Sequence, residues 1–179
     1  KPIREDVKKE GKFTGAYVQD PQKGKHDWVY DLDITSMYPS IIMSLNISPE
    51  TKIGKVVGWN PEEFISGKQK TYSIKMNGTK KGQFTETELK DFFDKNQVSI
   101  SDNGILYRTD KQGLIPTLLS EWFDKRKEFR KLAKKFGDEG DEEQYGYFNR
   151  RQHIQKIVLN SMYGVLGLPV FRFYDLDNA

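Results

Sequence analysis

The stretch WVYDLDITSMYPSII, residues 28–42, carries the strongest information about the fold. In residues 28–33 large apolar side chains alternate with smaller or acidic ones, which is typical of a half-buried β-strand. Pro39 fixes its own φ and restricts the backbone of Tyr38, so a sharp turn is expected at this point. Proline also suits the first turn of a helix, which we expect to continue to Leu45. The stretch therefore predicts a strand, a turn and a helix in succession.

Two long helices are expected in the second half of the chain. Residues 116–136 carry apolar side chains at helical spacing, and a second helix is expected from about Glu142 to Leu166. The acidic connection between them, residues 138–141, is short. A short link between two long helices favours an antiparallel helical hairpin.

The remaining segments are expected to be strands, irregular stretches and one short helix. Residues 98–107 predict a β-hairpin that turns at Asn103-Gly104. Within residues 54–97 only 86–94 has a helical pattern, and we interpret this region as a peripheral insert. Residues 1–25 are expected to form an arm or edge strand, and residues 170–174 have strand-like composition. The fold class expected from these elements is α+β.

Composition restricts the classes of partner only weakly. The net charge is +3, with 29 Lys and Arg against 26 Asp and Glu, which alone does not indicate nucleic acid. The chain has no cysteine, which excludes disulfides and thiolate metal sites. No apolar run approaches the roughly 20 residues of a membrane-spanning helix, so we expect no membrane partner. The lack of cysteine fits a reducing cytoplasm, which is the expected location. The absence of an initiating Met suggests an excised piece or a processed product.

One face of the second helix carries a polar stripe. Its members are spaced by three or four residues and include one cation, two amides of asparagine, one of glutamine and a phenol. They are Asn149, Gln152, Lys156, Asn160 and Tyr163. The opposite side carries Tyr147, Ile154, Val158 and Val165. The stripe is either a selective binding surface or an ordinary solvated face.

The first helix carries two arginines, Arg126 and Arg130, one turn apart and flanked by apolar residues. With Lys156 from the neighbouring helix they would form a clamp of three cations. Guanidinium groups bind phosphate oxygens in pairs and lysine adds a point charge, so the clamp suits a triphosphate. The alternative is a lysine-rich helix whose cations form salt bridges with its acids, which are Glu121, Asp124 and Glu128.

Asp33 lies at the expected end of the strand, immediately before the turn. Its carboxylate, with the turn amides and the Ser36 hydroxyl, could hold Mg²⁺ against phosphate, because Mg²⁺ prefers a few carboxylate oxygens with phosphates and waters. Asp31 is two residues away on the same expected strand face. The alternative is that both are ordinary acids at the end of a strand.

Two motifs then indicate a family. DITSMYPSII, residues 33–42, resembles the first palm motif of family B DNA polymerases, D-x-x-S-L-Y-P-S-I-I, and KIVLNSMYG, residues 156–164, resembles their fingers motif, K-x-x-x-N-S-x-Y-G. The resemblance extends from about Gly15 through Ala179 and is nearest to bacteriophage-type replicative members. It implies a partial palm in residues 1–110, with the insert at about 54–97, a fingers helical hairpin in 111–167, and a return to the palm in 168–179.

The resemblance also implies roles for individual residues. Asp33 corresponds to the carboxylate that binds both catalytic metals, with the Ile34 carbonyl as a further ligand and Lys156 as a second catalytic residue. The incoming nucleotide would be held by Ser36, the Met37 amide, Tyr38 as the steric gate, Arg126, Arg130, Lys156 and Asn160. Tyr163 and Gly164 correspond to the place where the nascent base pair is approached, so they are the expected DNA contacts.

The chain departs from the family pattern in two residues and in the lack of several family segments. Met37 replaces the usual Leu, and Arg130 stands where some phage relatives have Lys. The second metal-binding motif, Y-G-D-T-D, is absent, and we interpret the sequence YDLD at 174–177 as a palm connector. The exonuclease motifs and a thumb are missing as well. The resemblance therefore implies half of a two-metal Mg²⁺ site and a portion that is inactive alone.

The implied partners are primer-template DNA, deoxynucleoside triphosphates and the remaining polymerase segments, in the same or a separate chain. A viral source would place the protein in the cytoplasm of the infected host cell. Two other functions remain open. One is a nucleotide- or DNA-binding module without catalysis, and the other is an Mg²⁺-dependent nuclease that uses Asp31 and Asp33.

Overall fold

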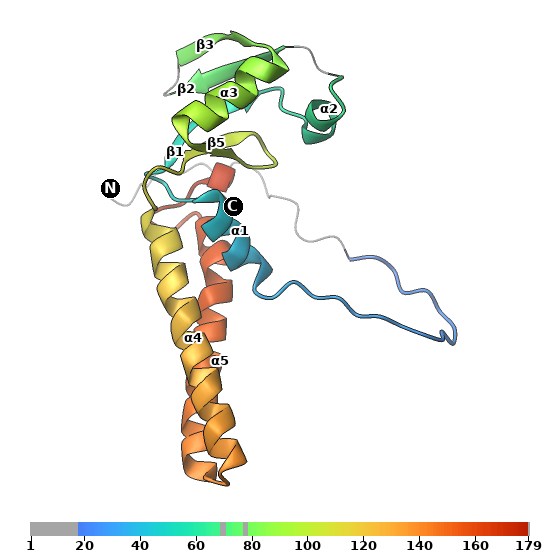
Figure 1. Cartoon of the computed structure of the whole chain (residues 1–179), viewed down its shortest axis with the longest axis vertical. Helices are drawn as coiled ribbons and strands as arrows, with labels where there is room; N and C mark the ends of the chain where they lie inside the picture. Colours follow the sequence, from blue (N-terminus) through green and yellow to red (C-terminus); the bar gives the residue numbers. More distant parts are fainter. Residues whose placement is uncertain (1–17, 69–70, 77–78, 179) are drawn as a thin grey trace.

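The structure, a computed structural model, describes residues 18–68, 71–76 and 79–178. A five-stranded antiparallel sheet lies at one end, and a long helical hairpin projects away from it (Figure 1). The strand order is β3-β2-β1-β5-β4. The strands are β1 (Lys52–Val57), β2 (Tyr72–Met76), β3 (Thr79–Phe84), β4 (Val98–Ile100) and β5 (Ile105–Arg108). The helices are α1 (Met37–Leu45), α2 (Pro61–Ile65), α3 (Glu86–Asn96), α4 (Leu114–Asp138), α5 (Glu142–Leu166) and the 3₁₀ helix η1 (Leu176–Asn178). The expected α+β class is confirmed.

Residues 54–97 contribute three strands to the sheet, although the sequence predicts only one helix there. That helix is confirmed as α3, and it begins with a capping box in which Thr85 and Glu88 bind each other's backbone amides. The α3 side of the sheet is buried, and its core consists of Val56, Tyr72, Ile74, Leu89 and Leu106. Helix α3 therefore packs on one face of the sheet, and the two form a two-layer unit around this core.

The predicted β4–β5 hairpin is confirmed, with Ile100 opposite Leu106. Gly104 in its turn has φ +81°, in the left-handed region. A Cβ at this position would lie 2.7 Å from the Cβ of Trp59. The turn therefore needs glycine both for its backbone conformation and for the close approach of Trp59.

The expected strand at residues 28–33 is wrong. These residues are irregular, with a positive φ at Trp28, and pair with no strand in the described part of the chain; Trp28, Tyr30 and Leu32 are more than 80% exposed. The alternating pattern is present, but a strand also needs a hydrogen-bonded neighbour, and none reaches this segment (Figure 1). Residues 170–174 likewise form turns, not a strand. The expected arm at 1–25 lies largely outside the described residues.

The expected hairpin of two long helices is confirmed as α4 and α5, which pack antiparallel along their length (Figure 1). The expected helix after the turn is α1, which begins two residues before Pro39. It packs against both hairpin helices near the sheet. The core of this junction consists of Ile42, Ile47, Ile105, Tyr107, Ile115, Leu119, Leu159 and Leu166.

The loop between α1 and β1 caps the N-terminus of α4. The Gly113 amide donates to Asn46 Oδ1 at 2.8 Å, and the Leu114 amide donates to Glu50 Oε1 at 2.5 Å. Asn46 Nδ2 also donates to the carbonyls of Arg108 and Lys111. Since the first amides of a helix have no partner within it, these bonds anchor the N-terminal end of α4 to the loop after α1.

Candidate functional site

The turn before α1 meets the side of α4. Ser36 has a left-handed backbone, with φ 52° and ψ 48°, which reverses the chain immediately before the helix. Arg126 Nη1 donates to Ser36 Oγ at 3.5 Å, a long contact at the limit of a hydrogen bond. The structure therefore brings one of the expected clamp arginines to the hydroxyl that the sequence assigns to phosphate.

The Arg126 guanidinium is short of partners at this position. Its Nε is buried and has no hydrogen-bond partner among the described residues. Burial lowers the pKa of Arg126, and the nearby charge of Arg130 lowers it further. A buried guanidinium donor without an acceptor is costly, so an anionic group beside Ser36 would stabilise it.

The alternative, a helix whose cations form salt bridges with its acids, is found at Lys127 but not at the two arginines. Neither Arg126 nor Arg130 forms an ion pair within the described part of the chain, whereas Asp124 pairs with Lys127 at 3.3 Å. The acids of α4 therefore leave both guanidinium groups available to a ligand.

Aromatic stacking joins α1 to α5. The rings of Tyr38 and Tyr163 lie 4.4 Å apart with an interplanar angle of 8°. Such a pair contributes roughly 0.5–1.5 kcal/mol beyond the area that it buries. Beside it, an added Cβ at Gly164 would meet no atom within 4 Å. The two motifs therefore meet at this stack, and the surface next to it is open.

Other expected site residues are exposed and separate. Asp33 and Ile34 lie in the extended segment before the turn, and Ile34 is 65% exposed. Lys156 and Asn160 are exposed on α5, and the described residues offer no hydrogen bond or ion pair to either side chain. Met37, whose amide is the expected ligand, is 39% exposed at the start of α1. The structure thus joins Ser36 to Arg126 and Tyr38 to Tyr163, but not Asp33 to Lys156.

The expected metal site offers oxygen donors, which suit Mg²⁺, but only a few of them. The Asp33 carboxylate and the Ile34 carbonyl are oxygen donors, which Mg²⁺ prefers. No group of three or more His, Cys, Asp or Glu capable of holding a metal occurs among residues 18–68, 71–76 and 79–178. The described residues therefore fit part of an Mg²⁺ site, with further ligands still to be supplied.

The polar stripe of α5 lies at the edge of the helix interface. The buried face runs through Leu159 and Leu166, between the stripe and the side that carries Tyr147 and Ile154. Tyr147 is 43% exposed and Ile154 is 58% exposed, so that apolar side faces outward instead of forming the core. Tyr163 sits half-buried in the stack, while Lys156 faces solvent.

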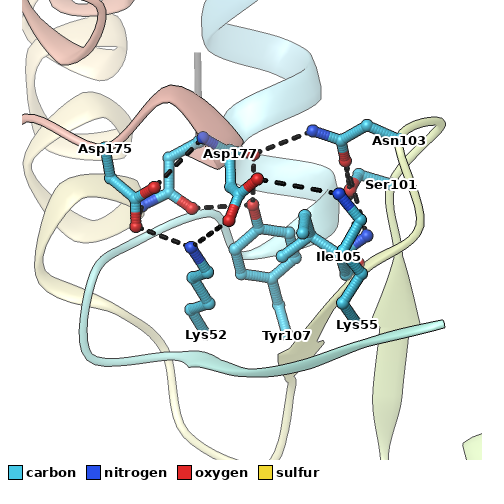
Figure 2. A network of polar contacts seen from close by, with 9 residues as sticks. Lys52, Lys55, Ser101, Asn103, Ile105, Tyr107, Asp175 and Asp177 are labelled. Carbon is cyan, nitrogen blue, oxygen red and sulfur yellow. Dashed lines mark hydrogen bonds and ion pairs between the residues drawn. The ribbon is translucent and has the colours of Figure 1, made fainter. Parts of the chain in front are cut away.

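The C-terminal YDLD segment is engaged with the sheet (Figure 2). Asp175 Oδ2 and Asp177 Oδ2 accept from Lys52 Nζ at 2.8 and 2.7 Å. Burial raises the pKa of Asp177, but the bond and charge of Lys52 outweigh it and hold the net pKa below its ordinary value. The Tyr107 hydroxyl donates to Asn178 Oδ1 at 2.8 Å. Lys52 therefore occupies both carboxylates and attaches the segment to β1; its role as a palm connector stays a prediction.

The sequence did not identify two anchoring residues. Asn46 binds the start of α4, and Lys52 binds the segment that follows α5. No local signal identifies either residue, since their partners lie more than 60 residues away along the chain. None of the helices in the described ranges is long and apolar enough to cross a membrane.

Comparison with known proteins agrees with the motifs. The sequence is similar to the DNA-directed DNA polymerase of Enterobacteria phage T4, at 28% identity over 93% of this chain and 22% of the phage protein. It is also similar to the DNA polymerase alpha catalytic subunit of Oxytricha trifallax, at 29% identity over 97% of this chain and 10% of that protein. The chain therefore spans about a fifth or less of the length of these relatives.

A solved structure shares the fold. The family B DNA polymerase from the hyperthermophilic archaeon Pyrobaculum calidifontis matches with a TM-score of 0.51 and 24% identity, over 80% of this chain and 14% of that one. The profile of DNA polymerase family B matches residues 2–179. This chain belongs to DNA polymerase family B.

Proposed function

We propose that this chain is the palm and fingers portion of a template-directed DNA polymerase, and that it binds an incoming deoxynucleoside triphosphate and Mg²⁺ for nucleotidyl transfer. Residues 1–110 and 168–179 would belong to the palm, and residues 111–167 to the fingers. The observation that carries the proposal is the contact of Arg126 with Ser36, where a buried guanidinium nitrogen lacks an acceptor. A phosphate at this point would accept from Arg126 and from the Ser36 hydroxyl together.

Each proposed residue then has a physical task. Arg126, Arg130 and Lys156 would neutralise the triphosphate as negative charge develops, while Ser36 and the Met37 amide donate to its oxygens. Asn160 would contact the same nucleotide from α5. The Tyr38 ring, held by its stack on Tyr163, would lie under the sugar and exclude a 2′-hydroxyl. Gly164 and Tyr163 would face the DNA, because the surface at Gly164 is open.

Asp33 and the Ile34 carbonyl would hold Mg²⁺. The bound metal would supply charge stabilisation at the phosphoryl group. Lys156 is exposed on α5 and would reach the nucleotide by a movement of the helical hairpin over a correctly paired base. Such a movement couples selection of the nucleotide to chemistry.

The same site is proposed to be inactive without further segments. The described residues offer no cluster of three potential metal ligands, and the two-metal mechanism needs a second carboxylate. The remaining palm and a thumb, in the same or a separate chain, would complete the site. Primer-template DNA would bind across the joined parts.

Equilibrium binding of a fluorescent deoxynucleoside triphosphate in Mg²⁺ tests the proposal. We expect Arg126→Ala and Lys156→Ala each to weaken binding about 10-fold or more, since a hydrogen bond to a charged group contributes roughly 1.5–3 kcal/mol. Lys127→Ala is the matched control, because this neighbouring cation already pairs with Asp124. Binding that is equal in all three variants and the unaltered chain would refute the clamp.

A primer-extension assay separates the proposed polymerase from the two alternatives. Extension that appears only after addition of the remaining palm and thumb supports the proposal, and loss of that extension in Asp33→Asn assigns the metal site. Nucleotide binding without extension in the completed mixture would favour a non-catalytic module. Nicking of duplex DNA by the chain with Mg²⁺, abolished by Asp33→Asn, would favour a nuclease.

A further inference from the structure

A cavity opens at the sheet end of the molecule, between α2, α3 and the β4–β5 hairpin (Figure 1). Its volume is about 470 Å³, which lies within the roughly 300–1,000 Å³ of ordinary binding pockets. Its apolar wall includes Trp59, Phe64, Phe93 and Ile100. Ile65 of α2 also lines the cavity and is 84% exposed. We refer to this cavity as the α2–α3 pocket.

The wall of the α2–α3 pocket is held by the core beneath it. Trp59, Phe64, Phe93 and Ile100 all pack against the buried cluster on the α3 side of the sheet. The rings of Trp59 and Phe64 lie 4.9 Å apart, and Phe64 meets the buried ring of Tyr72 edge-on at 5.5 Å. The pocket is therefore formed before any occupant enters it, which lowers the free-energy cost of binding.

Two carboxylates in the pocket have no cation beside them. Asp94 and Asp102 both line it, and neither forms an ion pair with another described residue. Lys90, the one cation among the described residues of the wall, is already paired with Glu86. Asp94 also stands in the last turn of α3, where the helix dipole disfavours a negative charge. A cation supplied from outside would therefore be stabilised at this point.

The two helices beside the pocket differ in charge from the chain as a whole. Together α2 and α3 carry six acidic residues and two lysines. The complete chain has a net charge of +3. A negative surface repels the phosphates of nucleic acids and attracts cationic partners. The charge of this surface therefore favours a basic protein over DNA.

We propose that the α2–α3 pocket is a protein-docking site, and that its occupant is a large apolar side chain from a basic segment of a partner protein. The apolar side chain would fill the cavity as a buried anchor. Lys or Arg residues beside it would pair with Asp94 and Asp102 and would orient the partner. The pocket shares no residue with the nucleotide site, so this inference goes beyond the proposed function and does not depend on it.

Selection from a library of random peptides, each of about a dozen residues and displayed on phage, tests the proposal on the immobilised full chain. We expect the enriched peptides to carry a large apolar residue flanked by Lys or Arg. Labelled synthetic copies then give dissociation constants by fluorescence anisotropy. The test variant carries Asp94→Lys and Asp102→Lys. The matched control makes the same change of charge on α4, with Glu121→Lys and Asp138→Lys.

The test variant should weaken binding of the selected peptides about 10-fold or more, and the control should change it less than about 2-fold. The four substituted side chains are exposed, so folding should be retained, which circular dichroism checks. Ile65→Ser should also weaken binding, because it removes apolar contact without a change of charge. A selected peptide whose Lys and Arg residues are replaced by Glu should prefer the test variant to the unaltered chain, a result that loss of folding cannot produce.

Three results would overturn the proposal. The first is enrichment of acidic or uncharged peptides, and the second is equal binding of the selected peptides by the test and control variants. The third is self-association of the chain that the test variant abolishes, because the occupant would then be a second copy. Nucleotide binding should be the same in the test variant and the unaltered chain, so either proposal can fail while the other is retained.

Discussion

Replacing Asn46 with alanine should remove the hydrogen bonds that anchor the N-terminal end of α4. Asn46 is 6% exposed and uses its whole amide: Nδ2 donates to the carbonyls of Arg108 and Lys111, at 2.7 and 2.9 Å, while Oδ1 accepts from the Gly113 amide at 2.8 Å. Its φ of 58° lies in the left-handed region, which asparagine tolerates better than alanine. The substitution therefore removes three hydrogen bonds and introduces backbone strain.

The expected loss of stability is about 3–4 kcal/mol. The hydrogen bonds contribute about 1 kcal/mol each, and the amide left without a partner at Gly113 costs more than its bond alone. The left-handed backbone adds up to about 1 kcal/mol for alanine. Since domains of this size have unfolding free energies of about 5–15 kcal/mol, the change removes a large share. It corresponds to a fall in Tm of roughly 10 °C.

Thermal and urea unfolding followed by circular dichroism measure the effect. Asn96→Ala is the matched control, because this exposed asparagine makes one bond, to the Phe92 carbonyl, and should cost about 1 kcal/mol or less. Asn46→Asp keeps the acceptor for Gly113 but sets a carboxylate oxygen against the Arg108 and Lys111 carbonyls, so it should also be destabilising. A loss below 1 kcal/mol for Asn46→Ala would show that the loop does not anchor α4, and the reasoning would fail.

Three further substitutions test other parts of the fold, each by urea unfolding. Lys52→Met should cost about 1 kcal/mol after solvent screening. Because the pKa of Asp177 is lowered on folding, the ion pair stabilises the chain above the unfolded pKa near 3.8, and this stabilisation is lost as pH falls through the folded pKa. The difference in unfolding free energy between Lys52→Met and the unaltered chain should therefore shrink below about pH 4. A difference that stays constant with pH would contradict the ion pair. Gly104→Ala should cost about 2 kcal/mol or more, since its Cβ would lie 2.7 Å from Trp59, and a neutral result would show that the turn relaxes. Thr85→Ala should cost about 1 kcal/mol through loss of the capping box, whereas Thr85→Ser should not.

The helices and the β4–β5 hairpin could be predicted because their signals are local. The apolar spacing of α4 and α5 and the short acidic link between them lie within single stretches of sequence. The turn at Asn103-Gly104 is also set by adjacent residues, because glycine readily adopts the positive φ that the turn needs. These elements need no knowledge of distant parts of the chain.

The rest of the sheet could not be predicted because its apolar pattern is broken. In β1 two lysines and a glycine interrupt the apolar residues and Val56 alone is fully buried, while β2 has only two buried residues, Tyr72 and Ile74. The segment 28–33 shows the opposite error, since it has strand composition but no neighbour in the described chain. In both cases pairing between segments far apart decides the outcome, and composition does not report it.

The candidate site was predictable only in part, because its residues come from segments far apart in the sequence. Ser36 and Arg126 are 90 residues apart, yet the structure brings them into contact. The roles of these two residues in nucleotide binding stay predictions, as do those of Arg130, Lys156 and Asp33. The anchoring contacts of Asn46 and Lys52 could not be predicted from the sequence, because neither residue belongs to a recognisable local pattern.

The unpaired segment before α1 has a practical consequence for spectroscopy. Trp28 is 89% exposed, whereas Trp59 and Trp122 are partly buried in the two cores. Its indole should emit at the long wavelengths of a hydrated fluorophore and be quenched readily by iodide. Any polypeptide that covers this segment would shift the emission to the blue and protect it from iodide, so the chain carries its own optical reporter of assembly.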